Sequence, residues 1–160
     1  MLRGATFDRT GLYRYRLWRE WDRALPTVAF IMLNPSTADA DHDDPTIRRC
    51  IGFARAWGFG RLEVVNLFAY RATTPRELFS ATDPVGTHNI TTVQQVLRDA
   101  SCVVLAWGNH GARAGDWRRT LLPFGWCLGL TTLGEPRHPL YVAGTAMPLH
   151  AGPTPCERDP

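Results

Sequence analysis

Four nearly continuous apolar segments limit most strongly how this chain can fold. They cover residues 27–33, 62–68, 102–107 and 126–130. A strand that is apolar throughout is covered on both faces, as in a parallel sheet, whereas a half-exposed strand alternates. Helical patterns separate these segments, and strands that alternate with helices imply right-handed crossovers. We therefore predict an α/β fold, a three-layer sandwich with a four-stranded parallel sheet.

The first helix has clear sequence signals at both ends. Asp44 is a predicted N-cap and Pro45 suits the first helical position, while Gly58 suits the C-cap after Trp57. Further helices are predicted from Pro75, over residues 87–100 and over residues 112–122.

An antiparallel hairpin is predicted before the parallel strands. Residues 5–7 and 12–18 flank a turn-like segment at 8–11. Arg14 and Arg16 fall on one face of the second strand, where they would either be solvated at the sheet edge or contact phosphate. We expect one domain over residues 1–160, with a hairpin extension at 1–26, a core at 28–142 and a loosely ordered tail at 147–160.

Charge and targeting signals set broad limits on partners. All 18 basic residues are arginine, and the net charge is +3. Arginine binds phosphate and stacks on bases, but without lysine no side-chain amine can form an imine. No apolar stretch is long enough for a membrane helix and no signal-peptide core is present. We expect a cytoplasmic monomer with no membrane partner.

The four cysteines predict no special chemistry. They show no CxxC pair, which favours buried or incidental thiols, and we expect no metal and no cofactor. They are Cys50, Cys102, Cys127 and Cys156.

Candidate functional residues follow the ends of the predicted strands. Ligands bind beyond the carboxyl ends of parallel strands, so side chains placed there converge on one rim. The residues concerned are Asn34, Pro35 and Ser36 after the first strand; Asn66, Phe68, Tyr70 and Arg71 at the second; Trp107, Asn109 and His110 after the third; and Arg137 and His138 after the fourth.

Several of these segments resemble the uracil-DNA glycosylase superfamily. Residues 32–36 are similar to its first motif, an apolar strand that ends in Asp/Asn-Pro, and residues 64–66 to the strand whose terminal Asn reads the base edge. Residues 103–111 are similar to the strand that ends in a Trp-Gly turn, and residues 137–141 to the His-Pro loop that holds the base carbonyl. The motifs occur in superfamily order, and they imply a uracil-DNA glycosylase-like fold.

The resemblance implies roles that compete with purely structural ones. Asn34 would position a water beside the sugar, or cap its turn; Asn66 would read a pyrimidine edge, or tie adjacent loops. His138 would donate to a base oxygen on which charge develops, or be a hydrogen-bonded loop histidine. Trp107 and Phe68 would form pocket wall or core.

Binding roles remain for the other candidates. Tyr70 would stack a flipped base and Arg71 would hold its phosphate. His110 and Arg113 would contact backbone phosphate, or belong to an exposed helix start.

The sequence departs from that superfamily in two places. The His-Pro motif lacks the following Ser-Pro, and the first loop is acidic, with five titratable residues at 39–44. That loop would be solvated beyond its N-cap, bind a metal, or supply a general base, for which Asp39 and Asp41 are the candidates.

A closer resemblance is to a bacterial and phage family known only as domain of unknown function 1643. The similar segments are residues 33–39, 44–49, 65–73 and 136–141.

The leading functional hypothesis is a monofunctional DNA glycosylase acting on a damaged, deaminated or modified base. The partner would be single- or double-stranded DNA. One alternative is a hydrolase or transferase acting on free nucleotides or nucleosides, and another is a non-catalytic module that binds nucleic acid or a modified base.

Overall fold

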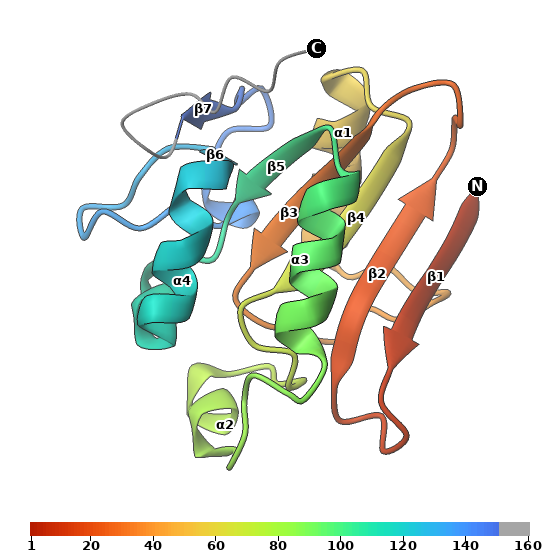
Figure 1. The fold of residues 1–160 in the computed structure, drawn as a ribbon. Helices are drawn as coiled ribbons and strands as arrows, with labels where there is room; N and C mark the ends of the chain where they lie inside the picture. Colours follow the sequence, from red (N-terminus) through yellow and green to blue (C-terminus); the bar gives the residue numbers. More distant parts are fainter. Residues whose placement is uncertain (151–160) are drawn as a thin grey trace.

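The computed structural model describes residues 1–150, which form an α/β fold around one mixed sheet (Figure 1). The strands are β1 (Leu2–Phe7), β2 (Arg14–Glu20), β3 (Thr27–Met32), β4 (Arg61–Asn66), β5 (Cys102–Leu105), β6 (Trp126–Cys127) and β7 (Leu149–His150). The helices are α1 (Pro45–Ala56), α2 (Pro75–Ser80), α3 (Asn89–Asp99) and α4 (Asp116–Leu121), with short 3-10 turns η1 (Asn109–Ala114), η2 (Leu122–Phe124) and η3 (Pro139–Tyr141).

The sheet is larger than the sequence predicted. Its order is β1-β2-β4-β3-β5-β6-β7, so it has seven strands instead of four. β4, β3, β5 and β6 run parallel, while β1, β2 and β7 pair antiparallel with their neighbours. The three additional strands are antiparallel: the predicted hairpin adds β1 and β2 at one edge of the parallel strands, and β7 adds at the other edge.

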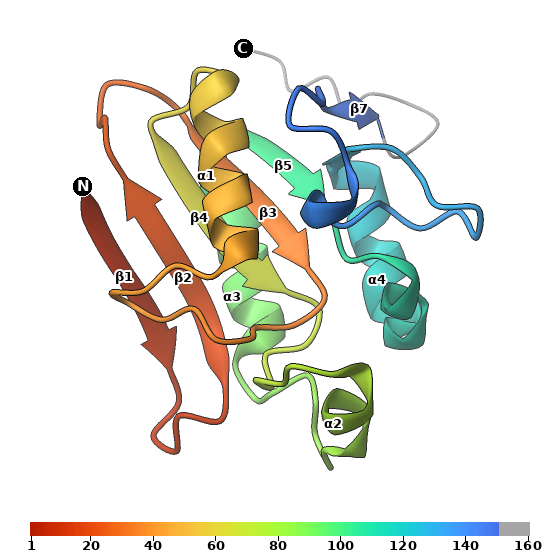
Figure 2. The same cartoon turned by 180° about the vertical axis from the view of Figure 1, so that it is seen from behind.

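Strand β3 is central because its residues are apolar on both faces. Val28, Phe30 and Met32 belong to one core cluster, and Ala29 and Ile31 to the other. Helix α1 packs against the first cluster and α3 and α4 against the second, so helices cover both faces of the sheet (Figures 1 and 2).

The start of α1 confirms the predicted N-cap. The Asp44 side chain accepts from the Ile47 N–H at 2.9 Å, and Pro45 occupies the first turn. At the other end, Trp57 is the C-cap and Gly58 has a φ of 84°, a conformation that suits glycine. The sequence therefore determines both ends of this helix.

Two predicted elements after β5 are wrong in length. The helix expected over residues 112–122 is divided into η1, α4 and η2 because Gly115 has a φ of 57° and a ψ of −127°, which is not helical. The fourth parallel strand, expected over residues 126–130, ends at Cys127, and Gly129 follows with a φ of 110°. Glycine conformations thus shorten both elements.

The predicted hairpin is confirmed, but Arg14 and Arg16 do not share a face. Thr6 pairs with Arg16 and Phe7 with Arg14, so a bulge at Tyr15 shifts the register. Such a bulge breaks the two-residue alternation of a strand. β2 also lies inside the sheet, between β1 and β4, so neither arginine is solvated at an edge.

Arg16 and Arg14 consequently have different surroundings. Arg16 donates to both Glu63 carboxylate oxygens, at 2.8 and 2.7 Å, and this bonding raises the pKa of Arg16. Arg14 is buried and donates to the Ala38 carbonyl, in the loop before α1.

Part of the predicted loose tail at residues 147–160 forms a strand. Leu149–His150 form β7, which pairs with β6, whereas residues 151–160, including Cys156, lie outside the described residues. Cys50 and Cys127 are buried, as expected for incidental thiols, and burial raises the pKa of the Cys50 thiol.

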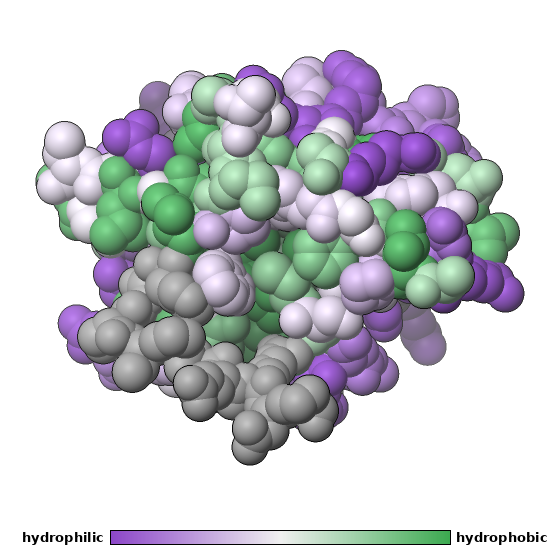
Figure 3. Space-filling model, turned by 90° about the horizontal axis from the view of Figure 1, so that it is seen from above, coloured by the Kyte–Doolittle hydropathy of each residue, from purple (hydrophilic) through white to green (hydrophobic). Residues whose placement is uncertain are grey.

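Seen from above, hydrophilic and hydrophobic residues are interspersed over the upper face (Figure 3).

Candidate functional site

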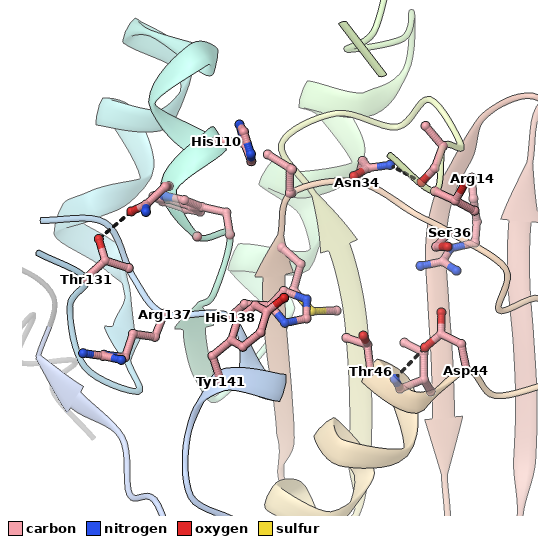
Figure 4. A pocket seen from close by; sticks show the side chains of 18 residues that line it. Arg14, Asn34, Ser36, Asp44, Thr46, His110, Thr131, Arg137, His138 and Tyr141 are labelled. Atoms are coloured by element: carbon pink, nitrogen blue, oxygen red, sulfur yellow. Dashed lines mark hydrogen bonds between the residues drawn. The ribbon is translucent and has the colours of Figure 1, made fainter. Parts of the chain in front are cut away.

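A pocket of about 510 Å³ lies beyond the carboxyl ends of β3 and β5 (Figure 4). Its walls come from the loop after β3, the start of α1, the loop after β5 and the segment around η3. It is lined by Arg14, Met32, Leu33, Asn34, Ser36, Asp44, Thr46, Ile47, Ala72, Thr73, Trp107, Gly108, Asn109, His110, Thr131, Arg137, His138 and Tyr141.

The strand order explains why a pocket forms there. From β3 the chain crosses by α1 over one face to β4, whereas from β5 it continues to α4 on the other face. The loops after these two adjacent strands therefore diverge and leave a crevice, the usual binding position in an open α/β sheet. Some of the polar residues predicted to converge at strand ends line this pocket, and others do not.

His138 is held in one tautomer at the rim of this pocket. Its Nδ1 accepts from the Leu140 N–H at 3.2 Å, so the neutral ring carries its proton on Nε2. Burial lowers the pKa of His138, while the nearby Asp44 carboxylate partly opposes this. A half-buried imidazole with a lowered pKa is neutral at neutral pH, and it offers one N–H donor.

Asn34 uses its amide nitrogen to join the loops after β3 and β4. Nδ2 donates to the Ala72 carbonyl at 2.9 Å and to the Pro35 carbonyl at 3.0 Å (Figure 4). Oδ1 makes no hydrogen bond within residues 1–150, and Asn34 lines the pocket. The residue thus ties two loops together, whereas the structural role considered from the sequence was a cap of its own turn, and its carbonyl oxygen is left to accept from a ligand or water.

Trp107 is both core and pocket wall. It is 2% exposed, and its Nε1–H donates to Glu135 Oε2 at 2.7 Å. Glu135 is also buried and forms an ion pair with Arg118 at 2.7 Å. Gly108, with a φ of 73° and a ψ of −172°, donates its N–H to the Pro136 carbonyl at 2.8 Å. These bonds fix the loop after β5 against the segment that leads to His138.

Polar groups line the side of the pocket formed by β2 and α1, and of these only Ser36 was among the predicted site residues. Arg14, Asp44 and Thr46 lie there with Ser36 (Figure 4). Of the two alternatives considered for Arg14, solvation at the sheet edge is wrong, because its guanidinium is buried against the loop before α1. The sequence indicated Asp44 as an N-cap and Arg14 as a candidate phosphate contact. It did not place Arg14 at the pocket, because the register of β2 that brings it here follows from the bulge.

Further lining residues come from the loop after β5 and the η3 segment. Asn109 accepts from the Thr131 hydroxyl at 2.6 Å, and the Tyr141 ring lies 5.7 Å from that of His138. Thr131 and Tyr141 were not identified from the sequence. His110 and Arg137 line the pocket as predicted, although Arg137 is exposed and donates to the Leu130 carbonyl.

The two proposed general bases lie outside the pocket lining. The Asp39 carboxylate accepts from the N–H groups of Asp41 and His42, both at 2.8 Å, which lowers its pKa to about 2. A carboxylate of that pKa is a weak base at neutral pH. The Asp41 carbonyl accepts a hydrogen bond from the Arg3 guanidinium. The lining carboxylate of this loop is Asp44.

Five other candidates are likewise not among the lining residues. They are Pro35, Asn66, Phe68, Tyr70 and Arg71. Tyr70 and Arg71, expected to face the pocket, instead pack on the hairpin: the Tyr70 ring lies 5.5 Å from that of Tyr13, and the Arg71 guanidinium 5.0 Å from the Phe7 ring. Sequence could not show this, because it depends on the hairpin turn lying beside the loop after β4.

Asn66 and Phe68 are buried below the site. Phe68 packs on Phe79 in the cluster beneath α3, with ring centroids 5.4 Å apart. Asn66 is 2% exposed, and neither its Oδ1 nor its Nδ2 has a partner among the described residues. Asn66 on β4 is paired in register with Met32 on β3. Met32 lines the pocket, so Asn66 lies one strand away from a lining residue.

Residues 1–150 contain neither a cluster of metal-ligand side chains nor a membrane-spanning helix. Within residues 1–150 no three His, Cys, Asp or Glu side chains are grouped as metal ligands would be. No helix in this range is both long enough and apolar enough to span a bilayer.

Comparison with known proteins identifies the family. The family described as "Protein of unknown function (DUF1643)" matches residues 14–140. This chain belongs to the DUF1643 family. The match confirms the closer of the two resemblances seen in the sequence and extends from β2 to η3, so it includes the segments that line the pocket. No match was found among curated proteins or among solved structures.

Proposed function

We propose that this DUF1643 protein is a monofunctional DNA glycosylase with a uracil-DNA glycosylase-like fold, acting on a damaged, deaminated or modified base. One observation carries the proposal: Asn34, Trp107 and His138, from three motifs that resemble that superfamily, line one pocket at the strand ends. A volume of about 510 Å³ is in the range of small-molecule sites and can hold a flipped base.

The neutral His138 suits the breaking of a glycosidic bond. As the bond between sugar and base breaks, negative charge develops on the base, including its carbonyl oxygens. A fixed Nε2–H donor stabilises that charge without first having to be protonated, in the manner of an oxyanion hole. The bond from Leu140 to Nδ1 fixes the donor nitrogen, and the Trp107 wall gives the base an aromatic surface.

The pocket wall that contains Asn34 and Asp44 would position and activate the water. Asn34 Oδ1 can accept a hydrogen bond from water but cannot remove its proton, so a carboxylate must act as the base. Asp44 lines the pocket, whereas Asp39 has a low pKa and lies outside the lining. We therefore assign water activation to Asp44. The chain has no lysine, so the product would be an intact abasic site.

The test is a screen of oligonucleotides that carry different modified bases, scored for abasic sites by alkaline cleavage. We expect cleavage only after alkali and no covalent adduct on borohydride treatment. His138→Asn keeps an acceptor for the Leu140 N–H but removes the Nε2 donor, so it should abolish activity. His88→Asn, at the start of α3 and outside the pocket lining, is the matched control. A His138→Asn variant with full activity would refute the assigned role.

A second candidate is an enzyme that acts on free nucleosides or nucleotides. Asp44 at the pocket, together with the acidic loop before α1, would repel a continuous phosphate backbone. Electrophoretic mobility shifts measured alongside nucleoside titrations separate the candidates. Nucleoside turnover without DNA binding would support the second candidate, and binding of a modified base without any product would indicate a binding module.

A further inference from the structure

Two buried arginines on β2 differ sharply in how many of their donors are used. Arg14 is 2% exposed and Arg19 is fully buried. Arg19 makes five bonds, to the Asp43 carboxylate and to the carbonyls of four residues. Those residues are Gly4, Trp18, Asp39 and His42. Arginine has five N–H donors, so the bonding of Arg19 is complete and its role is structural.

The Arg14 side chain makes only one hydrogen bond within residues 1–150. Its Nη1 donates to the Ala38 carbonyl at 2.8 Å. Its Nε is buried without a partner, and its Nη2 makes no hydrogen bond in the described chain. Because Nε–H and one Nη2–H point the same way on the planar guanidinium, one edge of Arg14 has two donors without a protein partner, on a residue that lines the pocket. Buried donors are rarely left unpaired in native proteins, so this edge indicates a ligand.

The charge around Arg14 selects the kind of ligand. Burial lowers the pKa of Arg14 to about 10, while the Asp44 carboxylate opposes that change, so the guanidinium is charged at neutral pH. The same carboxylate repels a phosphate or carboxylate ligand. A neutral group with two adjacent acceptors avoids this repulsion, and the flat wall of Trp107 in the same pocket suits a planar ring.

We propose that Arg14 determines base specificity, with its Nε–Nη2 edge binding O6 and N7 of a 6-oxopurine such as hypoxanthine. This inference rests on the proposed function and narrows its substrate. Arginine bound to O6 and N7 is the commonest specific contact to guanine. Adenine has an amino donor in place of O6, and uracil and thymine have no two adjacent acceptors. Cytosine does have such a pair, at O2 and N3, and must be compared directly.

The test measures binding of nucleosides by quenching of tryptophan fluorescence, because Trp107 lines the pocket. Inosine, 7-deazainosine, adenosine, cytidine, uridine and inorganic phosphate are titrated into the wild-type chain. Inosine should bind about 10-fold or more tightly than each of the others. The 7-deazainosine comparison needs no variant, since it removes N7 alone from the ligand.

Arg14→Lys and Arg19→Lys form the matched pair of variants. Both keep the charge, and both replace a buried arginine that holds the loop before α1. Arg14→Lys should weaken inosine binding about 10-fold while leaving uridine binding unchanged, and Arg19→Lys should retain the inosine preference even if it melts earlier.

Four results would overturn the assignment: equal binding of inosine and 7-deazainosine, preference for cytidine, preference for phosphate, or no nucleoside binding at all. Failure of the proposed function has a different signature. Inosine binding that depends on Arg14, with no abasic sites formed in any oligonucleotide, would support this inference and refute the glycosylase. Excision of hypoxanthine that Arg14→Lys leaves unchanged relative to uracil would do the reverse.

Discussion

Replacing Gly111 by alanine tests how closely the pocket wall is packed. A Cβ built on Gly111 would lie 2.0 Å from Trp107 Cδ1 and 2.6 Å from Nε1. Carbon atoms pack at about 3.5–4 Å, so the indole would have to move by roughly 1.5 Å. Trp107 is 2% exposed and bonded to Glu135 at 2.7 Å, so moving the indole would disturb its packing and stretch this hydrogen bond.

The expected loss of stability combines two effects. Overpacking a core costs about 1–3 kcal/mol, and loosening a hydrogen bond to a buried carboxylate costs about 1.5–3 kcal/mol. A single movement of the Trp107 indole causes both effects, so the two costs are not fully additive. We expect Gly111→Ala to lower the free energy of unfolding by about 2–5 kcal/mol. Urea denaturation followed by fluorescence measures this quantity, and the near-ultraviolet circular dichroism of the tryptophans should change.

Gly52→Ala is the control, because it makes the same substitution where space is open. Gly52 lies exposed within α1, and no atom lies within 4 Å of a Cβ built there. Alanine should stabilise this helix by about 0.5–1 kcal/mol. A Gly111→Ala variant as stable as the wild type would contradict the close packing of Gly111 against Trp107.

Three further predictions concern charges and caps. Burial lowers the pKa of His138 below 6.5, so the unfolded chain binds this proton first as the pH falls. The contribution of His138 to stability is therefore full above about pH 6.5 and declines below it. Urea denaturation measured over a range of pH should show a smaller decline for His138→Asn. Asp44→Ala should cost about 1 kcal/mol of unfolding free energy because α1 loses its N-cap, whereas Asp44→Asn should cost only a few tenths, as measured by urea denaturation. Glu135→Gln should lower the free energy of unfolding by about 2–4 kcal/mol because it leaves Arg118 without its carboxylate. Asp116→Asn, in an exposed ion pair, should change the denaturation midpoint very little. Equal effects of the two substitutions would contradict the burial argument.

The parts of the fold that sequence predicted are those that local chemistry determines. The apolar pattern of residues 27–33 requires cover on both faces, and β3 lies at the centre of the sheet. Asp44 and Pro45 set the start of α1 through their own backbone and side-chain preferences. Asn34 and His138 were placed correctly at the pocket because both follow elements whose direction the chain order fixes.

The remaining features depend on contacts between distant segments. Tyr70 and Arg71 turn away from the pocket because the hairpin turn packs beside them, and nothing in residues 65–73 encodes that neighbour. Arg14 enters the pocket because the bulge at Tyr15 and the pairing of β2 with β4 set its direction. Sequence alone thus determined the alternation of strands and helices and the edge of the sheet at which the pocket lies. Which side chains line the pocket was decided only by the tertiary structure, because a side chain's direction is set by strand register and by packing between segments far apart in the chain.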